Sequence, residues 1–465
     1  MENPMSRKKN KVIIRIFTCF FTLVLFSCSS FKNKTWDEDF IINPKYQTFA
    51  ESLEQYLSET SFSGSVLLAQ NKDIIFAKGY GLCDPKDQGS QKITIHTVFE
   101  SGSLTKLPTA CCVMLLAQKN KLSTEDTLEK YFSDYKYAGD ITIDLLLKMR
   151  SGLTDCINSP DEFFPPDVLR SLEKKMHANE SVEENLVLNY FYSAPLMTAP
   201  DSTYFYCNTN YYLLAKIVEN VSGLSFGEYI KKNVFDVAGM NHTNTQFQRT
   251  DSVGYDYKGR YFSIPSELAF GSGDMNSSVL DLYKMNTAFA EGKIVKKKMI
   301  KKMTNSESYG YGVYCRDNVI FHSGVTNVFN SYNSYDFTDK LSVIVLINAP
   351  VSSMNATFFA GNIRKMWEEY KESILFELKG INKFDYQLLK KAKMEFSDDN
   401  SLLLQLEESV IAEERSGHLR DYLDKVFYDR CGLNIDIKIG FYKRRSAGNI
   451  ELTDKKIHME IVNIV

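Results

Sequence analysis

The stretch from Thr105 to Gln118 would be apolar on nearly every side of a helix. A helix at a protein surface keeps one polar face toward water, so a helix of this kind must be surrounded by protein. Of the 465 residues, 44% are hydrophobic, which is enough for the large core that such a helix requires. At roughly 100 to 200 residues per domain, the length predicts one large domain and one small one.

Apolar runs toward both ends of the first 370 residues predict a sheet. Gly64 to Ala69 and Ile74 to Ala77 are joined through the polar turn residues Asn71, Lys72 and Asp73, which is typical of a β-hairpin. Near the other end, Val319 to Phe321 and Leu341 to Ile347 predict central strands. Between the buried helix and about Asn241, the middle of the chain is mostly polar and helix-prone. We therefore expect the first and last strands to pair beside a helical subdomain, with a site in the cleft between the two parts.

Periodicity also predicts helices at Phe49 to Glu59 and at Ala356 to Tyr370. Beyond about Glu372 the chain is rich in Lys and Glu, and we predict that residues 372–465 form a small α+β domain of unknown role. Its expected helices lie around Phe384 to Phe396, Leu402 to Glu414 and His418 to Tyr428, and its expected strands at Ile435 to Ile439 and Ile457 to Ile464.

The N-terminus has the pattern of an export signal. Basic residues precede the apolar run Ile16 to Phe26, which is too short to span roughly 30 Å of hydrocarbon but suits the core of a signal peptide. The run ends at Cys28 in a segment that resembles a bacterial lipobox. We expect residues 1–28 to be a lipoprotein-type signal with Cys28 lipidated, and residues 29–44 to be a tether. The folded part would then lie outside the cytoplasm, anchored to a membrane. A plain secretory signal or short anchor with an incidental cysteine is the alternative.

Charge and cysteine content exclude several classes of protein. The net charge is -3 and no clustered basic face is visible, so we expect no nucleic-acid partner. The nine cysteines include no CxxC pair and no spacing that suggests zinc ligands. The sequence therefore predicts neither a disulfide framework nor a metal site.

A hydroxyl and an amine stand three residues apart at the start of the buried helix, in Ser103 and Lys106. Residues at this spacing share a helix face, and a helix N-terminus offers N–H groups and positive potential to an oxyanion. The spacing alone is weak, because other Ser-x-x-Lys matches start at Ser6, Ser29, Ser133 and Ser171. Ser103 differs from these in following a glycine and preceding a long apolar helix.

Two triplets add further polar groups. Tyr206 and Asn208 flank Cys207 before the apolar run Tyr211 to Val221, and an i, i+2 pair in an extended segment points to one side. In the second triplet, His322 to Gly324, glycine allows close approach of a substrate and histidine supplies a polar or cationic group.

In this order, the three elements resemble the serine β-lactamase and penicillin-binding-protein superfamily. The branch concerned contains class C β-lactamases, D-alanyl-D-alanine carboxypeptidases and related esterases. Ser151 to Leu153 and Gly239-Met240 also look like motifs of this superfamily. The resemblance covers roughly Tyr46 to Tyr370. It implies that residues 45–371 form a serine hydrolase domain of the α/β (α+β) class, with an antiparallel sheet flanked by helices and a helical subdomain.

The resemblance also implies roles for the residues in the motifs. Ser103 would attack an acyl carbonyl and become an acyl-enzyme, with Lys106 and Tyr206 sharing the role of general base. Asn208 would hold the substrate amide or Lys106. His322 would tune Tyr206 and meet a substrate carboxylate.

The backbone after His322 has an implied role as well. The N–H groups of Ser103 and Val325, with Gly324 beside them, would form an oxyanion hole. No cofactor or metal is implied. The expected reaction is hydrolysis of an amide or ester in a small molecule or peptide, such as a D-amino-acid peptide or a β-lactam.

One departure from the resemblance bears on the substrate. His322 stands where lysine is common, which leaves less fixed positive charge for a carboxylate. This fits the esterase and peptidase relatives better than an efficient β-lactamase. The alternative keeps the fold but changes the class, to a penicillin-binding or sensory protein that acylates slowly or not at all.

Overall fold

The computed structural model describes residues 38–245, 250–256, 258–261, 264–348, 354–377, 385, 387–389, 392–397, 401–431 and 436–442. The predicted export signal with Cys28 and the predicted strand Ile457 to Ile464 lie outside these residues. Within these ranges, none of the helices combines the length and the hydropathy that a bilayer crossing requires.

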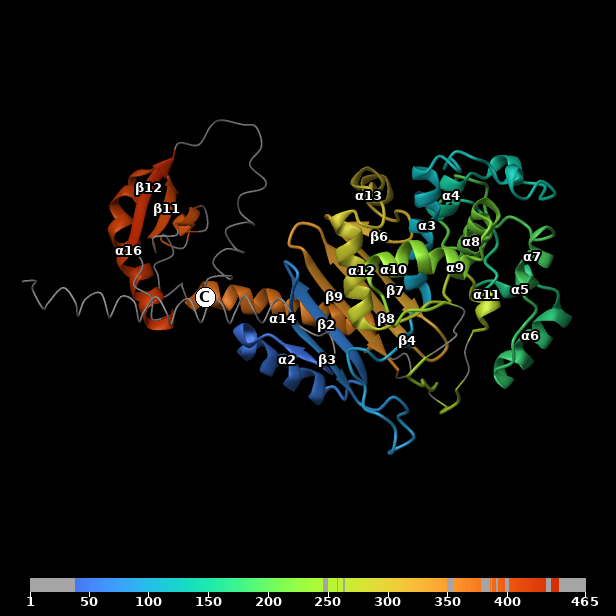
Figure 1. The fold of residues 1–465 in the computed structure, drawn as a ribbon, viewed down its shortest axis with the longest axis horizontal. Helices are drawn as coiled ribbons and strands as arrows, with labels where there is room; N and C mark the ends of the chain where they lie inside the picture. The colour runs from blue at the N-terminus through green and yellow to red at the C-terminus, as the bar shows by residue number, and fades with distance from the viewer. Residues whose placement is uncertain are drawn as a thin grey trace, which may run out of the picture. The chain divides into compact units, whose positions relative to one another are not determined.

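A seven-stranded antiparallel sheet lies at the centre of the main domain, in the strand order β1-β3-β2-β9-β8-β7-β6 (Figure 1). Its strands are β1 (Ile41–Ile42), β2 (Gly64–Gln70), β3 (Asp73–Tyr80), β6 (Tyr314–Arg316), β7 (Val319–Val325), β8 (Asn330–Asp336) and β9 (Leu341–Ile347). A smaller pair consists of β4 (Phe99–Glu100) and β5 (Asn276–Ser277). Because β2 pairs with β9, the expected contact between the first and last strands is confirmed.

The turn between β2 and β3 follows from its residues. Asn71 and Lys72 both have positive φ, at 51° and 74°. Two left-handed central residues match the right-handed twist of the flanking strands, and asparagine tolerates this conformation well. The predicted hairpin is therefore confirmed.

Strands β2 and β9 are buried at every position, on both faces of the sheet, which explains why their sequences are mainly apolar. On one face, Val343 and Val345 of β9 pack in a core with Trp367. The helices α2 (Gln47–Glu59) and α14 (Ala356–Glu377) both contribute side chains to this core. On the other face, Ile344 and Leu346 belong to a second, larger core with α3 (Lys106–Gln118) and α12 (Val279–Glu291). The alternation along β9 thus divides the domain into two layers of helices around one sheet.

The helical subdomain covers the second face. It includes α4 (Ile143–Leu147), α5 (Pro160–Phe163), α6 (Pro166–Ala178), α7 (Leu186–Phe191), α8 (Asn208–Ser222), α9 (Phe226–Ile230), α10 (Asp236–Ala238) and α11 (Ser266–Ala269). Short turns of other helix types are η1 (Pro44–Tyr46), η2 (Gly102–Thr105), η3 (Leu128–Lys130), η4 (Ala138–Asp140) and η5 (Lys231–Phe235). All side chains of α3 from Lys106 to Leu116 are buried, as predicted from its composition.

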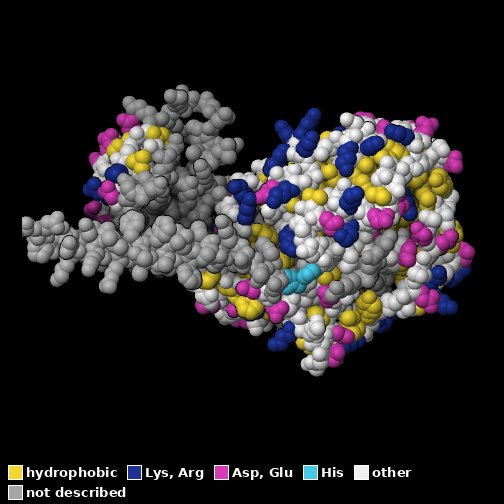
Figure 2. All heavy atoms as spheres, in the orientation of Figure 1, with side chains coloured by type: hydrophobic (Ala, Val, Ile, Leu, Met, Phe, Trp, Pro, Cys, Tyr) yellow, Lys and Arg dark blue, Asp and Glu magenta, His cyan; other side chains and the backbone are white. Residues whose placement is uncertain are grey.

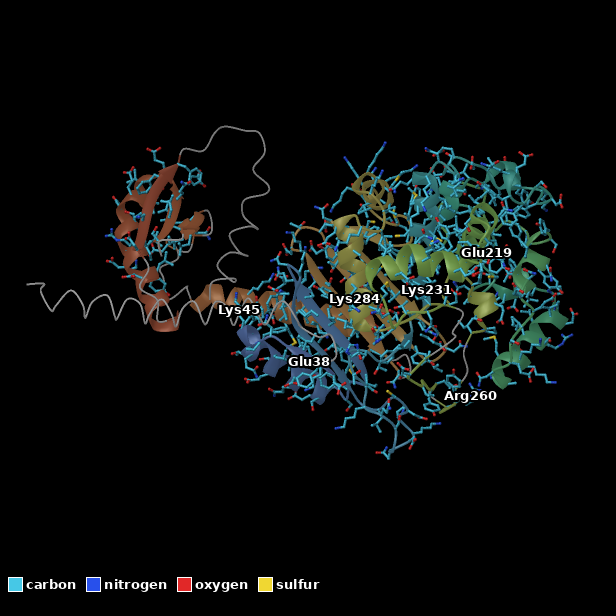
Figure 3. The ribbon with its side chains drawn as sticks, in the orientation of Figure 1. Glu38, Lys45, Glu219, Lys231, Arg260 and Lys284 are labelled. Atoms are coloured by element: carbon cyan, nitrogen blue, oxygen red, sulfur yellow. The ribbon has the colours of Figure 1, made fainter. Side chains whose placement is uncertain are left out.

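Ion pairs between residues three positions apart join charged side chains within two helices. On α8, Lys216 forms an ion pair with Glu219 at 3.1 Å, and on α12 Lys284 pairs with Asp281 at 3.0 Å (Figure 3). Lysines are exposed along α13 (Lys297–Thr304), and Figure 2 shows Lys and Arg side chains gathered over this part of the surface.

The C-terminal region has a core of its own, separate from the two above. Its strands are β10 (Lys393–Ser397), β11 (Ser401–Glu407) and β12 (Asp436–Tyr442), in that order, and its helix is α16 (Val410–Cys431). The core includes Leu402, Leu404 and Leu406 from β11.

Two helices predicted in this region are only partly correct. Leu402 to Glu414 begins as β11 and ends in α16, and Phe384 to Phe396 is helical at residues 385 and 387–389 but ends in β10. Leu, Gln and Glu favour helices intrinsically, but the every-second-residue burial of β11 decides its structure. The predicted helix His418 to Tyr428 lies within α16, and β12 overlaps the predicted strand Ile435 to Ile439.

Candidate active site

Two glycines bring η2 and β7 into backbone contact. Gly102 has a φ of +52°, and a Cβ at this position would lie 3.1 Å from the backbone nitrogen of Val325. A Cβ on Gly324 would lie 2.1 Å from the carbonyl oxygen of Ser101. Any larger side chain would separate the two segments. Ser103 is thereby held next to the end of β7, beside Val325.

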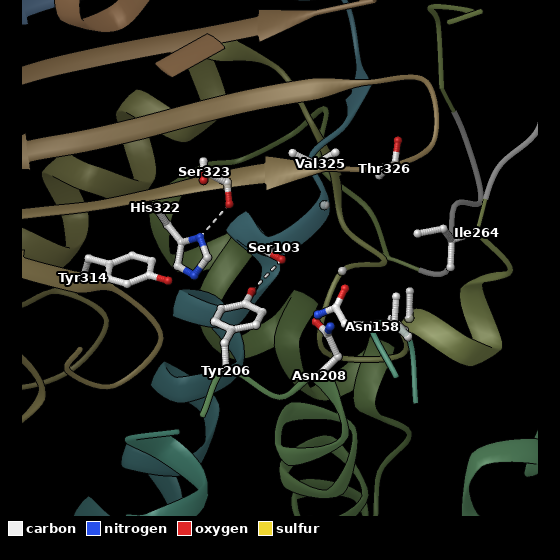
Figure 4. A pocket seen from close by; sticks show the side chains of 14 residues that line it. Ser103, Asn158, Tyr206, Asn208, Ile264, Tyr314, His322, Ser323, Val325 and Thr326 are labelled. Carbon is white, nitrogen blue, oxygen red and sulfur yellow. Dashed lines mark hydrogen bonds between the residues drawn. The ribbon is translucent and has the colours of Figure 1, made fainter. Parts of the chain in front are cut away.

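The hydroxyl of Ser103 is the meeting point of two other side chains. Its Oγ lies 3.0 Å from Lys106 Nζ and accepts a hydrogen bond from the Tyr206 hydroxyl at 2.8 Å (Figure 4). Lys106 Nζ also donates to Asn208 Oδ1 at 2.8 Å and to the carbonyl oxygen of Ser272 at 2.7 Å. The structure therefore brings together four of the side chains predicted from the sequence.

Local backbone geometry aims Tyr206 and Asn208 at the same place. Cys207 between them is extended, with φ -145° and ψ 117°, so its neighbours leave the chain on one side, as expected. Asn208 then begins α8, three residues before the predicted start at Tyr211. Cys207 itself is buried, and its N–H donates to the sulfur of Met149 at 3.3 Å.

Burial changes the ionisation of both partners of Ser103. Lys106 is fully buried, and the cost of burying its charge lowers its pKa to about 7, although the carboxylate of Asp155 opposes this effect. Burial raises the pKa of Tyr206 well above 10, because here the charged form is the phenolate. Near neutral pH the site therefore offers a partly deprotonated amine and a protonated phenol.

Asp155 was missed by the sequence analysis, although it lies two residues after the Ser151 to Leu153 turn. Its carboxylate is fully buried and accepts hydrogen bonds from the N–H groups of Ile157 at 2.8 Å and Asn158 at 3.1 Å. An aspartate bonded to backbone groups two and three residues later is a common turn, so a polar turn was detectable. Its contacts with Asn208, 53 residues away, were not.

His322 differs from expectation in its partners and its charge. Its Nδ1 lies 2.6 Å from the carbonyl oxygen of Ser323 and its Nε2 lies 3.2 Å from the hydroxyl of Tyr309. The carbonyl can only accept, so Nδ1 carries the proton and Nε2 accepts from Tyr309. Burial, reinforced by the nearby charge of Lys106, lowers the pKa of His322 to about 3. The ring is neutral and contacts Tyr206 with its centroid 6.0 Å away.

A pocket of about 250 Å³ opens over Ser103. Its described lining includes Asn158, Tyr206, Tyr314 and Val325, as Figure 4 shows, but no Asp, Glu, Lys or Arg. The described residues contain no group of three or more His, Cys, Asp or Glu side chains that could hold a metal ion. The arrangement provides a nucleophile, a base and an acid beside a neutral cavity.

Comparisons with known proteins identify relatives of this chain. Residues 49–363 match the profile of the Beta-lactamase family. The chain is 29% identical over 312 residues to a provisionally assigned penicillin-binding protein of Bacillus subtilis, PbpX, covering 64% of this chain and 73% of that protein. It is 24% identical over 321 residues to the teichoic acid D-alanine hydrolase of Staphylococcus aureus, covering 66% and 74% respectively. The D-amino acid amidase of Ochrobactrum anthropi shares the fold, with a TM-score of 0.59 at 19% identity over 70% of this chain and 99% of that one.

Proposed function

Because this chain belongs to the Beta-lactamase family, we propose that it is an exported serine hydrolase that forms an acyl-enzyme on Ser103 and hydrolyses an amide or ester. The hydrolases among its relatives support such chemistry in general. One observation supports the proposal most directly: Ser103 Oγ lies within hydrogen-bond distance of both Lys106 Nζ and Tyr206 OH, at 3.0 Å and 2.8 Å, beneath an open pocket.

In the first half of the reaction, neutral Lys106 is the base. A neutral amine has two N–H groups, which Asn208 Oδ1 and the Ser272 carbonyl accept, so its lone pair is left for the hydroxyl of Ser103. Ser103 Oγ attacks the carbonyl carbon while its proton moves to Lys106. Backbone N–H groups at Ser103 and Val325 stabilise the oxyanion, worth about 3 kcal/mol per donor. Tyr206 then protonates the departing oxygen or nitrogen.

The second half returns the site to its starting state. The Tyr206 phenolate takes a proton from a water molecule, which attacks the acyl-enzyme. The bond between the acyl group and Ser103 Oγ breaks, and Lys106 gives its proton back to the hydroxyl. Both proton carriers are thereby restored without a further group.

The neutral pocket bears on the substrate. Without a lysine or arginine in its described lining and with His322 uncharged, it has no cation to pair with a substrate carboxylate. We therefore favour esters or amides of D-amino acids that lack a carboxylate beside the scissile bond over β-lactams. The names of two relatives, a teichoic acid D-alanine hydrolase and a D-amino acid amidase, agree with this choice.

Active-site labelling tests whether Ser103 is the nucleophile that forms the proposed acyl-enzyme. Wild type and Ser103→Ala are treated with a fluorescent fluorophosphonate and with fluorescent penicillin, and label release is followed. We expect rapid fluorophosphonate labelling of the wild type alone, weak penicillin labelling and turnover of a D-amino-acid ester. Stable penicillin labelling without turnover would instead favour the penicillin-binding alternative. Labelling that persists in Ser103→Ala would remove Ser103 from the mechanism.

Export remains part of the proposal, motivated by the sequence around Cys28. We propose that a lipid on Cys28 anchors the hydrolase on the outer side of a membrane. The full chain expressed in bacteria should partition into the detergent phase, and Cys28→Ala should move to the aqueous phase. Identical partitioning of the two proteins would end the lipoprotein proposal.

A further inference from the structure

The buried carboxylate of Asp155 contacts two asparagines in the same way. Asn208 donates to it from its backbone N–H at 3.1 Å and from Nδ2 at 3.0 Å and 3.2 Å. Asn158 donates from its backbone N–H at 3.1 Å and from Nδ2 at 2.7 Å. Asp155 is therefore enclosed by donors from two segments, and it fixes which end of each side-chain amide faces it.

For Asn208, this choice orients the base. Because Nδ2 faces Asp155, Oδ1 faces Lys106 Nζ, 2.8 Å away. If the amide were reversed, an N–H would face the amine and Lys106 would lose an acceptor. Asp155 thus holds Lys106 in place without touching it.

For Asn158, the same choice determines what the pocket offers. Its Nδ2 is used by Asp155, so its Oδ1 is left as an acceptor in the pocket lining. In Figure 4, Tyr206 lies below Ser103 toward the left and Asn158 below it toward the right, so the two side chains approach Ser103 from different directions. If Tyr206 protonates the leaving group, the acyl group lies on the side of Asn158.

We propose that Asp155 is a positioning residue that orients both amides, and that Asn158 Oδ1 accepts a hydrogen bond from an N–H group on the acyl part of the substrate. The inference rests on the proposed hydrolase function and narrows its substrates to aminoacyl or acylaminoacyl esters and amides. The amide oxygen of Asn158 is an acceptor that can receive a hydrogen bond from either an ammonium or an amide N–H.

The charge of Asp155 gives a measurement that a purely structural role would not move. The titratable groups that act on Lys106 or contact it are Asp155, Asp274, Cys156, Cys207, Tyr206, Tyr211 and His322. Among them the Asp155 carboxylate does most to raise the pKa of Lys106 against the effect of burial. Its removal lowers this pKa further, so the amine becomes neutral at a lower pH.

The first test compares Asp155→Asn with Asp281→Asn. Asp281 is also a buried carboxylate, which accepts from the N–H of His242 at 2.7 Å and lies outside the pocket lining. For D-alanine methyl ester, the acid limb of kcat/KM should move about one pH unit lower in Asp155→Asn, and the plateau should fall, because Asn208 is no longer oriented. In Asp281→Asn, the acid limb of kcat/KM should lie at the same pH as in the wild type. An unmoved limb in Asp155→Asn, or an equal shift in both variants, overturns the role of Asp155.

The second test reads Asn158 through a matched pair of substrates. D-alanine methyl ester and methyl propionate differ only in the amino group, and a pH-stat follows the acid released from each. In Asn158→Leu, the ratio of kcat/KM between the two esters should fall about tenfold, the effect of one lost hydrogen bond. An unchanged ratio, or a wild type that prefers methyl propionate, overturns the inference. A wild type that hydrolyses neither ester contradicts the proposed function itself.

Discussion

Burial sets opposite protonation states on residues that lie side by side. Lys106 becomes easier to deprotonate, with a pKa of about 7, while the pKa of Tyr206 rises because its neutral form carries the proton. The same burial keeps His322 neutral. A base and an acid can therefore coexist around Ser103 without a metal or an acidic dyad, since one desolvated environment acts on groups of opposite charge type.

The first prediction concerns the pH dependence of acylation. If neutral Lys106 is the base, kcat/KM for p-nitrophenyl acetate should rise with pH around a midpoint of about 7, because the amine loses its proton there. Lys106→Arg keeps the charge but cannot deprotonate, so its rate should fall by about 10² to 10⁴. Stopped-flow rates from pH 5 to 9 check both. A variant as fast as the wild type would assign the base elsewhere.

The second prediction concerns stability. The pKa of His322 is about 3 in the folded chain against 6.5 for an ordinary histidine, so protonation favours unfolding. The neutral ring of His322 makes its full contribution to the free energy of unfolding above pH 6.5, and this contribution is lost as the pH falls toward 3. Between pH 7 and pH 5 the wild type should lose about 2 kcal/mol that His322→Asn does not lose. Urea unfolding at both pH values measures this, with the exposed His177→Asn as control. Parallel losses in all three proteins would refute the buried neutral ring.

Spacing related the site residues that are neighbours along the chain, and the family resemblance related the three motifs to one another, but neither revealed Asp155, whose role depends on a tertiary contact. Ser103 and Lys106 share one helical turn, and Tyr206 and Asn208 one extended segment, so spacing alone related each pair. The link from Asp155 to Asn208 joins segments 53 residues apart, and no spacing encodes it. For His322 the position was found but not the charge, since its burial and its bond to Tyr309 arise only in the folded chain.

At the scale of elements, the site depends on how closely η2 and β7 approach. Strand β7 ends against the turn that holds Ser103, and Gly324 leaves no room there for a methyl group. The order of strands places β7 near the edge of the sheet, between β8 and β6. Movement of its last residues would therefore displace the N–H of Val325 while the rest of the sheet stays paired.

The third prediction tests this contact. In Gly324→Ala, the new Cβ would lie 2.1 Å from the Ser101 carbonyl oxygen and 2.3 Å from Ser331 Oγ, so the backbone must move. We expect kcat/KM for p-nitrophenyl acetate to fall at least about 10²-fold, the effect of losing one oxyanion donor. The matched control is Gly361→Ala on α14, where a Cβ meets nothing within 4 Å. This variant should keep its activity and gain about 0.5–1 kcal/mol, because alanine favours a helix. Full activity in Gly324→Ala would show that the contact is not needed.

Elements were predictable where pattern and burial agree. The sequence of β9, in which Ser342 is the one polar residue, and the all-round apolar α3 both indicate burial, and both elements are buried. In β11 the two signals conflict, since its leucines suit a helix but pack at every second position against α16. Only the partner in the fold resolves that conflict, which is why the sequence predicted a helix there.

At the scale of the whole molecule, different parts of the chain contribute to different hydrophobic cores. Among the residues that the structure describes, the two cores around the central sheet draw on residues up to α14 and on none beyond it, whereas the core of the C-terminal region begins at Leu389. The buried apolar residues around Ser103 belong to the larger of the two cores around the sheet. The bounds that we predicted for the two domains, 45–371 and 372–465, stay a prediction, but the separate cores suggest a direct experiment.

The fourth prediction is that the main domain works alone. A chain that ends at Glu377 keeps both cores around the sheet, so its kcat/KM for p-nitrophenyl acetate should stay within about twofold of the full chain. A chain that ends at Asn355 loses α14, and with it the buried Phe359, Ile363 and Trp367. Truncating Phe or Trp costs about 3–5 kcal/mol and truncating Ile about 2–5 kcal/mol, so the three losses together match the 5–15 kcal/mol that stabilise a typical domain. We therefore expect the chain that ends at Asn355 to be unfolded. Circular dichroism and activity distinguish the outcomes. If the chain that ends at Glu377 unfolds cooperatively yet is inactive, the C-terminal region must act on the site, because neither of the two cores around the sheet would have lost a residue.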